Sequence, residues 1–264
     1  MSVEILKGPR VVVLKTDGIN CDEETQYAFE KAGARAEIIH LNQFREEKKF
    51  ADFEIIVIPG GFSYGDDVAP GRVMAVELQT QFADQLLEHV GEGRFVIGIC
   101  NGFQVLVQTG LLPFGELISL DKTRASLTAN NSGRFESRWV YVSPQISACP
   151  FVIEDEPLRM PVAHGEGKFV TDLKTLLQLE EGGQITFRYA RVDGSATMDY
   201  PANPSGSYHA IAAICDRTGK IFGLMPHPER NVEAYHDPNF RRSGGREPSG
   251  LKLIKNIVKV ARGS

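Results

Sequence analysis

The sequence contains one cysteine in a pattern that favours nucleophilic chemistry, Gly98-Ile99-Cys100-Asn101-Gly102. Glycines on both sides of a nucleophile suit a sharp turn from strand to helix, because side chains at those positions would collide. A thiol at a helix N-terminus is easier to ionise, and the N–H of Asn101 would point toward an oxyanion beside Cys100. The alternative is a buried, inert cysteine on a tight turn, and the segment alone favours neither.

A base and its orienting carboxylate are indicated by Pro226-His227-Pro228-Glu229. Pro228 biases His227 toward an extended conformation, in which side chains two residues apart share a face. His227 and Glu229 would then lie side by side, as the base and orienter of a catalytic triad do. Taken alone, the segment is more typical of a proline-rich surface loop.

A pair of glycines, Gly60-Gly61, follows an apolar run earlier in the chain. Its free N–H groups could complete an oxyanion hole, since glycine lets the backbone approach a substrate closely. In isolation a tight turn is the better interpretation. Together with the elbow cysteine and a downstream His227 and Glu229, the glycines favour a nucleophilic enzyme.

Alternating strands and helices must position these segments. Nearly continuous aliphatic runs predict buried strands at residues 11–14, 36–41, 53–58 and 94–99. Helical patterns follow three of them, near residues 22–32, 73–90 and 103–107. Strands that alternate with helices form parallel βαβ units, whose functional loops gather at the carboxyl ends of the strands. We therefore expect a site built from the loops 16–21, 59–67 and 100–104.

The second half of the chain has a different pattern, with short apolar runs separated by turns. It predicts strands at residues 138–142, 167–170, 184–189, 210–215 and 221–225, a loop over 191–207 and a closing helix over 251–261. We predict an α/β fold with an open, mostly parallel sheet flanked by helices, a cysteine nucleophile elbow and a smaller antiparallel extension. The whole chain, residues 1–264, is predicted to be one domain.

Composition excludes several classes of protein. Lys and Arg number 29 against 34 Asp and Glu, a net charge of −5, which argues against a broad nucleic-acid surface. No apolar run approaches the roughly 18–20 residues of a membrane span, and no secretory signal is recognisable. The four cysteines never form CxxC, so we expect no disulfide framework, no metal site and a cytoplasmic location. No base is paired in sequence with the other three, Cys21, Cys149 and Cys215.

The quoted motifs resemble those of the triad-type (class I) glutamine amidotransferases. The segments that carry this resemblance are residues 58–61, 98–104 and 226–229. Further segments are similar to the glutaminase subunits of phosphoribosylformylglycinamidine synthase, a family of de novo purine synthesis: residues 18–22, 61–66, 131–136, 163–167 and 223–230. The match runs in the same order from about residue 11 to the final helix.

The resemblance implies a role for each matching position. Cys100 would be the nucleophile, His227 the general base and acid, and Glu229 its orienter. Gly61 and Asn101 would supply the oxyanion N–H groups. The implied glutamine-binding positions are Gly60, Gly61, Asn101, Gln104 and Phe135.

The Ala163–Gly167 segment also matches, but the sequence alone gives it no role. Within it, His164 is not expected to be catalytic.

By the same resemblance, glutamine is the substrate, and its ammonia goes to a separate synthetase subunit. That subunit would use ATP and Mg²⁺ to aminate formylglycinamide ribonucleotide, with a small bridging subunit completing the complex. This chain has no G-x-x-x-x-G-K-[ST] loop, so we expect it to bind no cofactor itself. The alternatives are a glutaminase subunit serving another acceptor, which residues 61–66 and 163–167 argue against, and a non-catalytic cysteine-elbow binding module, which the intact triad argues against.

Overall fold

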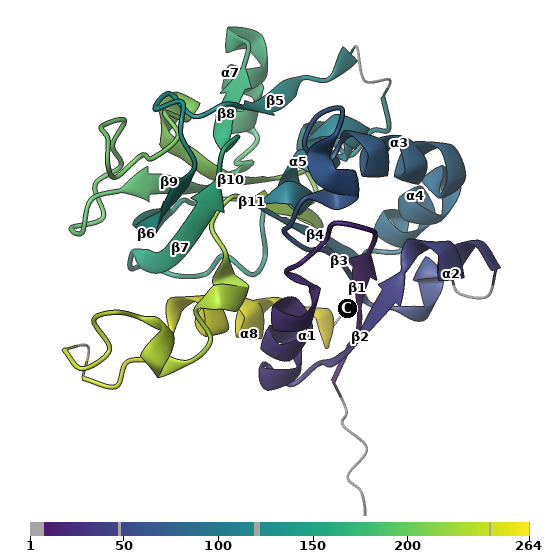
Figure 1. Cartoon of the computed structure of the whole chain (residues 1–264), viewed down its shortest axis with the longest axis horizontal. Coiled ribbons are helices and arrows are strands. Elements are labelled where there is room, and N and C mark those ends of the chain that lie inside the picture. The colour runs from purple at the N-terminus through teal and green to yellow at the C-terminus, as the bar shows by residue number, and fades with distance from the viewer. Residues whose placement is uncertain (1–7, 47–48, 119–121, 243, 264) are drawn as a thin grey trace, which may run out of the picture.

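The computed structural model describes residues 8–46, 49–118, 122–242 and 244–263 (Figure 1). Within these ranges one large sheet runs in the order β2 (Arg35–His40), β1 (Arg10–Lys15), β3 (Ile55–Ile58), β4 (Phe95–Ile99), β11 (Ile221–Leu224), β10 (Ile211–Cys215), β9 (Ile185–Ala190), β6 (Glu136–Pro144) and β7 (Leu158–His164). The strands from β2 to β11 are parallel, and those from β10 to β7 continue the sheet antiparallel. A separate antiparallel pair joins β5 (Ala125–Thr128) to β8 (Lys168–Thr171).

Helices cover both faces of the parallel strands. The helices are α1 (Asp22–Lys31), α2 (Leu41–Glu46), α3 (Arg72–Gln81), α4 (Ala83–Gly91), α5 (Asn101–Thr109), α6 (Leu111–Phe114), α7 (Leu173–Glu181) and α8 (Ser249–Ala261). In Figure 1, α1 and α8 lie on one side of the sheet and α3, α4 and α5 on the other. None of the helices in these described ranges has both the length and the apolar character needed to cross a membrane.

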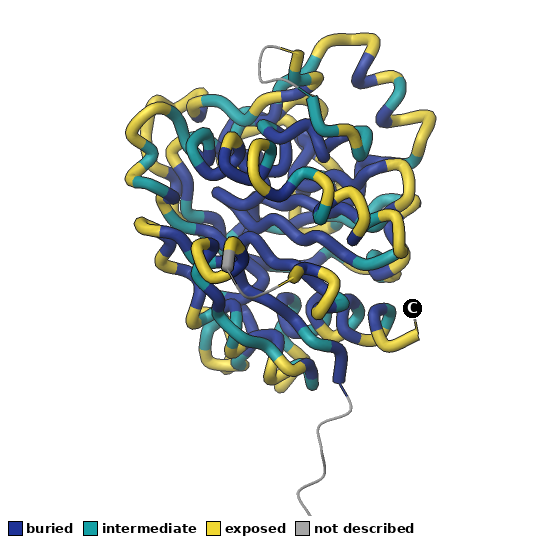
Figure 2. Tube along the Cα trace, turned by 90° about the vertical axis from the view of Figure 1, so that its right-hand side faces the viewer, coloured by how far each residue is buried: buried dark blue, intermediate teal, exposed yellow. Residues whose placement is uncertain are grey.

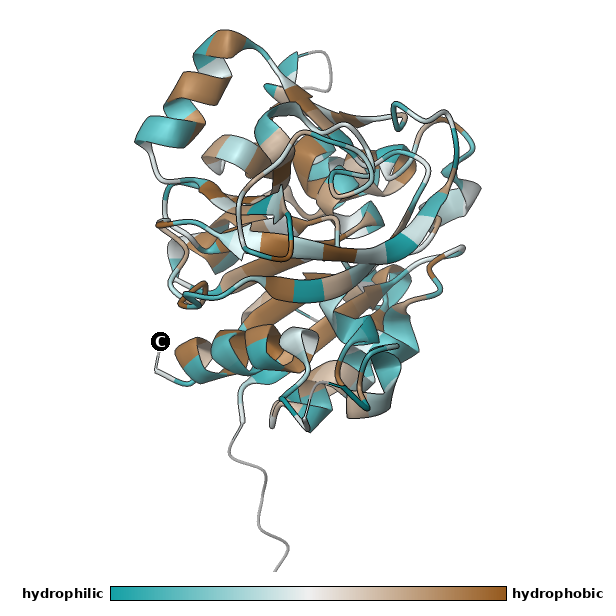
Figure 3. Ribbon diagram, turned by 90° about the vertical axis from the view of Figure 1, so that its left-hand side faces the viewer, coloured by the Kyte–Doolittle hydropathy of each residue, from teal (hydrophilic) through white to brown (hydrophobic). Residues whose placement is uncertain are grey.

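Burial on both faces explains why the central strands are so apolar. Every residue of β3, β4, β10 and β11 is buried, as strands between two helical layers must be. Figure 2 shows this buried layer at the centre of the molecule, with exposed residues on the surrounding loops and helices. The outer helix α8 mixes apolar and polar residues (Figure 3) and buries Leu251, Leu253, Ile254, Ile257 and Val258.

The predicted fold class is confirmed, with differences in detail. The single helix predicted over residues 73–90 is two helices, because the backbone leaves helical geometry at Phe82 (φ −129°). The strand β7 was not predicted, since Pro161 interrupts its sequence pattern. Proline is tolerated there because β7 is the last strand of the sheet, where a missing N–H costs no ladder hydrogen bond.

The strand order decides which loops meet. The neighbours β1, β3, β4 and β11 are parallel, so the loops after them leave from the same edge of the sheet. Those loops contain the predicted 16–21 and 59–67 segments, Cys100 and His227. Residues far apart in sequence therefore converge at one edge, where ligands of open α/β sheets bind.

We expect Gly102→Ala to destabilise the fold by about 3 kcal/mol or more. The physical reason is close packing of α5 on β3: a Cβ at residue 102 would lie 1.9 Å from the carbonyl oxygen of Ile58. The matched control is Gly91→Ala in α4, where a Cβ meets nothing within 4 Å. Urea denaturation followed by circular dichroism measures both variants. Equal midpoints would contradict the close approach of α5 to β3.

Candidate active site

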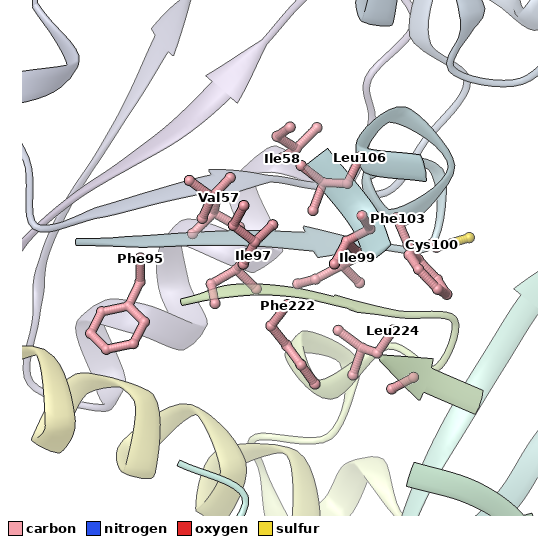
Figure 4. Close-up of a cluster of buried hydrophobic side chains, with 14 of the residues drawn as sticks. Val57, Ile58, Phe95, Ile97, Ile99, Cys100, Phe103, Leu106, Phe222 and Leu224 are labelled. Atoms are coloured by element: carbon pink, nitrogen blue, oxygen red, sulfur yellow. The ribbon is translucent and has the colours of Figure 1, made fainter. Parts of the chain in front are cut away.

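Cys100 lies at a strained turn between β4 and α5. Its backbone has φ 51° and ψ −104°, a conformation that costs a non-glycine residue about 1–3 kcal/mol. A Cβ at Gly98 would lie 2.6 Å from the carbonyl oxygen of Gly102, so the turn can close only with small residues on both sides. Figure 4 shows the sulfur of Cys100 directed away from the apolar side chains around β4. The predicted elbow geometry is thus present.

His227 and Glu229 form a buried pair. Nδ1 of His227 lies 2.5 Å from Oε1 of Glu229, and both residues are 1% exposed. The prediction that both lie in one extended segment is wrong, because Pro228–Arg230 form a short 3₁₀ helix. The tight turn nevertheless brings the carboxylate back to the imidazole, and the predicted contact exists.

The pair sets the charge of the imidazole. Burial acts to lower the pKa of His227, but the negative charge of Glu229 and the thiol of Cys100 outweigh it and raise the pKa well above its ordinary value. Since the carboxylate oxygen can only accept, Nδ1 carries a proton, and Nε2 is the atom left for exchange with another group. The arrangement matches a base held in one tautomer by an orienting carboxylate.

The absence of a side chain at Gly60 lets three side chains converge. A Cβ built there would lie 2.9 Å from Cε1 of His227, 3.1 Å from Sγ of Cys21 and 3.5 Å from Cβ of Cys100. His227 and Cys100, which follow β11 and β4, therefore lie against the same small residue after β3. At Gly60 the predicted base therefore lies beside the predicted nucleophile.

No base is paired with Cys21 in sequence, but the fold brings one to it. Cys21 follows β1 and lies beside His227, and Nη2 of Arg230 donates to its sulfur over 3.1 Å. Burial raises the pKa of Cys21 to about 11, so its thiol stays protonated at neutral pH. The available signal was its position in the 16–21 loop, but only the strand order shows that this loop reaches His227.

The predicted residues line or support one cavity of about 320 Å³. The predicted residues on its walls are Gly61, Cys100, Gln104, Phe135 and His227. The remaining predicted residues contact those on the walls. Gly60 lies against His227 and Cys100, Asn101 donates to Gln104, and Glu229 accepts from His227. Residues on the wall that sequence reasoning missed include Cys21, Ala163, His164, Glu166 and Arg230. A larger cavity, of about 550 Å³, lies near β7 and the start of α8 and contains none of the predicted residues.

Asn101 and Gln104 are joined in a buried network. The Ser63 hydroxyl donates to Oδ1 of Asn101 (2.7 Å), and Nδ2 of Asn101 donates to Oε1 of Gln104 (3.0 Å). Nε2 of Gln104 donates to the carbonyl of Glu166 (2.8 Å). The Asn101 side chain is thus held within the protein, while its backbone N–H, first in α5, has no acceptor within the helix. A binding role for Gln104 stays a prediction.

One set of side chains near the cavity has the composition of a metal site. Ligand atoms of Cys21, His227 and Glu229 lie within 4.8 Å of one another. Sulfur, nitrogen and oxygen are ligands that zinc accepts. The hydrogen bond between Nδ1 of His227 and Oε1 of Glu229 accounts for the closeness of these two residues without a metal. A metal bound to both of these atoms would have to displace the proton between them. The prediction of no metal in this chain stays a prediction.

Comparisons with known proteins agree on one family. Residues 8–260 match the CobB/CobQ-like glutamine amidotransferase domain. A protein of Methanococcus maripaludis named phosphoribosylformylglycinamidine synthase subunit PurQ is 42% identical, over 95% of this chain and 97% of its own length. A protein of the same name from Dehalococcoides mccartyi is 43% identical over 96% and 98%. A chain in the solved structure of PurLQS from Thermotoga maritima is 30% identical with a TM-score of 0.72, covering 96% of this chain and 99% of that one.

We expect Glu229→Gln to lower the pKa of His227 by about 1–3 units, because a neutral amide replaces the negative charge beside the imidazole. NMR titration of isotope-labelled histidine measures the shift. The control is Glu24→Gln, which removes a carboxylate bound to Arg230 rather than to His227. A His227 pKa that is the same in Glu229→Gln and the wild type would contradict the coupling.

Proposed function

Because this chain belongs to the CobB/CobQ-like glutamine amidotransferase family, and within it to the relatives named phosphoribosylformylglycinamidine synthase subunit PurQ, we propose that it hydrolyses glutamine on Cys100. The observation that best supports this is that Cys100, at its strained turn, and the buried His227–Glu229 pair lie against the same residue, Gly60. A nucleophile, a base and an orienting carboxylate that meet at one cavity are typical of a catalytic site and are not required in a binding module.

The proposed reaction has two halves. His227 takes the proton of the Cys100 thiol as the sulfur attacks the carboxamide carbon of glutamine, and then donates that proton to the departing nitrogen, which leaves as ammonia. The product on the enzyme is a glutamyl thioester. Water then attacks the thioester carbon while His227 takes a proton, and the bond to sulfur breaks to release glutamate. Glu229 keeps the imidazole in the tautomer that both halves need.

Each tetrahedral intermediate places a negative charge on the former amide oxygen. We assign its stabilisation to the backbone N–H groups of Gly61 and Asn101, which come from the loops after β3 and β4. The position of Asn101 at the N-terminus of α5 supports this, because the helix dipole favours negative charge there. Gly60, Gln104 and Phe135 complete the proposed glutamine pocket.

The ammonia has a proposed destination. The relatives are named as subunits of phosphoribosylformylglycinamidine synthase, and the similar solved chain comes from PurLQS. We infer that this chain docks on a synthetase subunit, with a small bridging subunit, and delivers ammonia to formylglycinamide ribonucleotide. ATP and Mg²⁺ would be used by the synthetase, and no cofactor is proposed for this chain. Because the nucleophile is a free thiol, we propose the reducing cytoplasm as its location.

We expect Cys100→Ala to abolish glutamine-dependent synthesis in the reconstituted complex and to leave synthesis from added ammonia intact. The physical reason is that ammonia bypasses the thioester. The control is Cys215→Ala, which removes a buried thiol from β10 outside the cavity. Product formation from each nitrogen source measures both variants. Near-normal glutamine use by Cys100→Ala would overturn the assignment of the nucleophile.

We expect glutamate release by the isolated chain to be slow and to rise when the synthetase is bound with its nucleotide substrates. An unpartnered site would waste glutamine, so the loop containing Gly61 is proposed to reach its active geometry on docking. Such a shift requires the partner to bind the competent state more tightly, and coupling of this kind is typically about 5–150-fold. Steady-state glutamate release with the partner titrated in measures it. Full activity without the partner, unchanged on demonstrated binding, would favour a free-standing glutaminase.

A further inference from the structure

A second histidine, His164, lies at the cavity with one ring nitrogen unused. It ends β7, is 3% exposed and lines the same cavity as Cys100 and His227. Its Nε2 is buried and has no hydrogen-bond partner among the described residues. A buried polar atom without a partner costs about 1–3 kcal/mol, so a ligand or water is expected to satisfy it.

Asn130 fixes the tautomer of this ring. The Nδ2 group of Asn130 donates to two carbonyls, those of Arg134 and His164, and its Oδ1 accepts from the N–H of Gly167. These partners define which end of the amide is oxygen. The same Oδ1 lies 3.0 Å from Nδ1 of His164, so Nδ1 must carry the proton. Nε2 of the neutral ring is then an acceptor, on the opposite edge from Asn130.

The ring is also kept neutral and in place. Burial, helped by the positive charge of His227, lowers the pKa of His164 to about 4. The ring lies on Gly167, where a Cβ would come within 2.4 Å of Nδ1 and Cε1. Near neutral pH, His164 therefore presents one fixed acceptor, while His227 in the same cavity has a raised pKa.

Ala163, the residue before His164, lies beside the proposed nucleophile. The carbonyl oxygen of Ala163 lies 3.7 Å from the sulfur of Cys100. The end of β7 thus brings a carbonyl acceptor to the thiol and, one residue later, the His164 ring to the wall of the same cavity. Glutamine has N–H donors on its α-ammonium and on its carboxamide, and the carboxamide is the group that meets Cys100.

We propose that Nε2 of His164 accepts a hydrogen bond from the carboxamide N–H of glutamine and so selects the amide over the carboxylate of glutamate. This rests on the proposed glutaminase function. A carboxylate has no proton to donate, and its lone pairs would face the lone pair of Nε2. The same group that holds the substrate amide therefore disfavours the product. His164 is thus assigned as a substrate-binding residue, and its expected lack of a catalytic role stays a prediction.

The test compares two substitutions in the reconstituted complex. His164→Phe keeps a planar ring and removes the acceptor, whereas His164→Gln keeps an acceptor oxygen. We expect His164→Phe to lower kcat/KM for glutamine about 10–100-fold, as expected for leaving a donor unpaired, and His164→Gln to recover much of the loss. The inhibition constant of glutamate should stay the same or fall. Unchanged kcat/KM in His164→Phe would overturn the proposal.

A substrate analogue separates this role from a structural one. 6-Diazo-5-oxo-norleucine has the amino-acid end of glutamine but carries a diazomethyl ketone in place of the carboxamide, so it offers no N–H to His164. We expect it to inactivate His164→Phe through Cys100 as fast as it inactivates the wild type. Inactivation slowed as much as glutamine turnover would overturn the proposal and indicate a distorted pocket. Failure of the wild type to release glutamate or to be inactivated would instead contradict the proposed function.

Discussion

The close approach of α5 to the parallel strands is the constraint on which the site depends. It is accompanied by a backbone with positive φ at Cys100 and leaves no space for side chains at Gly98 and Gly102. The apolar layer formed by β3, β4 and β11 supplies the burial that offsets this strain. The same turn directs the sulfur of Cys100 away from the apolar side chains around β4 and places it beside the N-terminus of α5, where negative charge is favoured.

Two buried histidines in one cavity have pKa values shifted in opposite directions. The negative charge of Glu229 raises the pKa of His227, whereas burial, helped by the positive charge of His227, lowers the pKa of His164, whose partner Asn130 is neutral. The proposed proton-exchanging group and the proposed acceptor therefore line the same cavity as Cys100. Pairs of titratable groups whose environments push their pKa values apart are typical of acid–base enzymes. The two histidines come from different parts of the sheet, since His227 follows the parallel β11 and His164 ends the antiparallel β7.

Much of this protein could be predicted from local sequence patterns. Steric conflict at the Gly98–Gly102 turn and the continuous apolar runs of β1, β3 and β4 are short-range properties, so they indicated the elbow, the α/β class and the loops to inspect. The His227–Glu229 contact was also predictable, although by a 3₁₀ turn rather than an extended segment. That residues 1–264 form one domain, and that the site residues act as assigned, stay predictions.

Other features were decided only by the tertiary structure. The approach of Cys21 to His227 depends on β1 lying next to β3 in the sheet, and no local pattern contains strand order. The strand β7 could not be predicted from its sequence, because Pro161 is acceptable only in an edge strand. Which strand lies at the edge is decided by strand pairing. The proton on Nδ1 of His164 depends on Asn130, 34 residues away in sequence. Sequence determines which residues favour a turn or a buried strand, whereas long-range packing determines which of them touch.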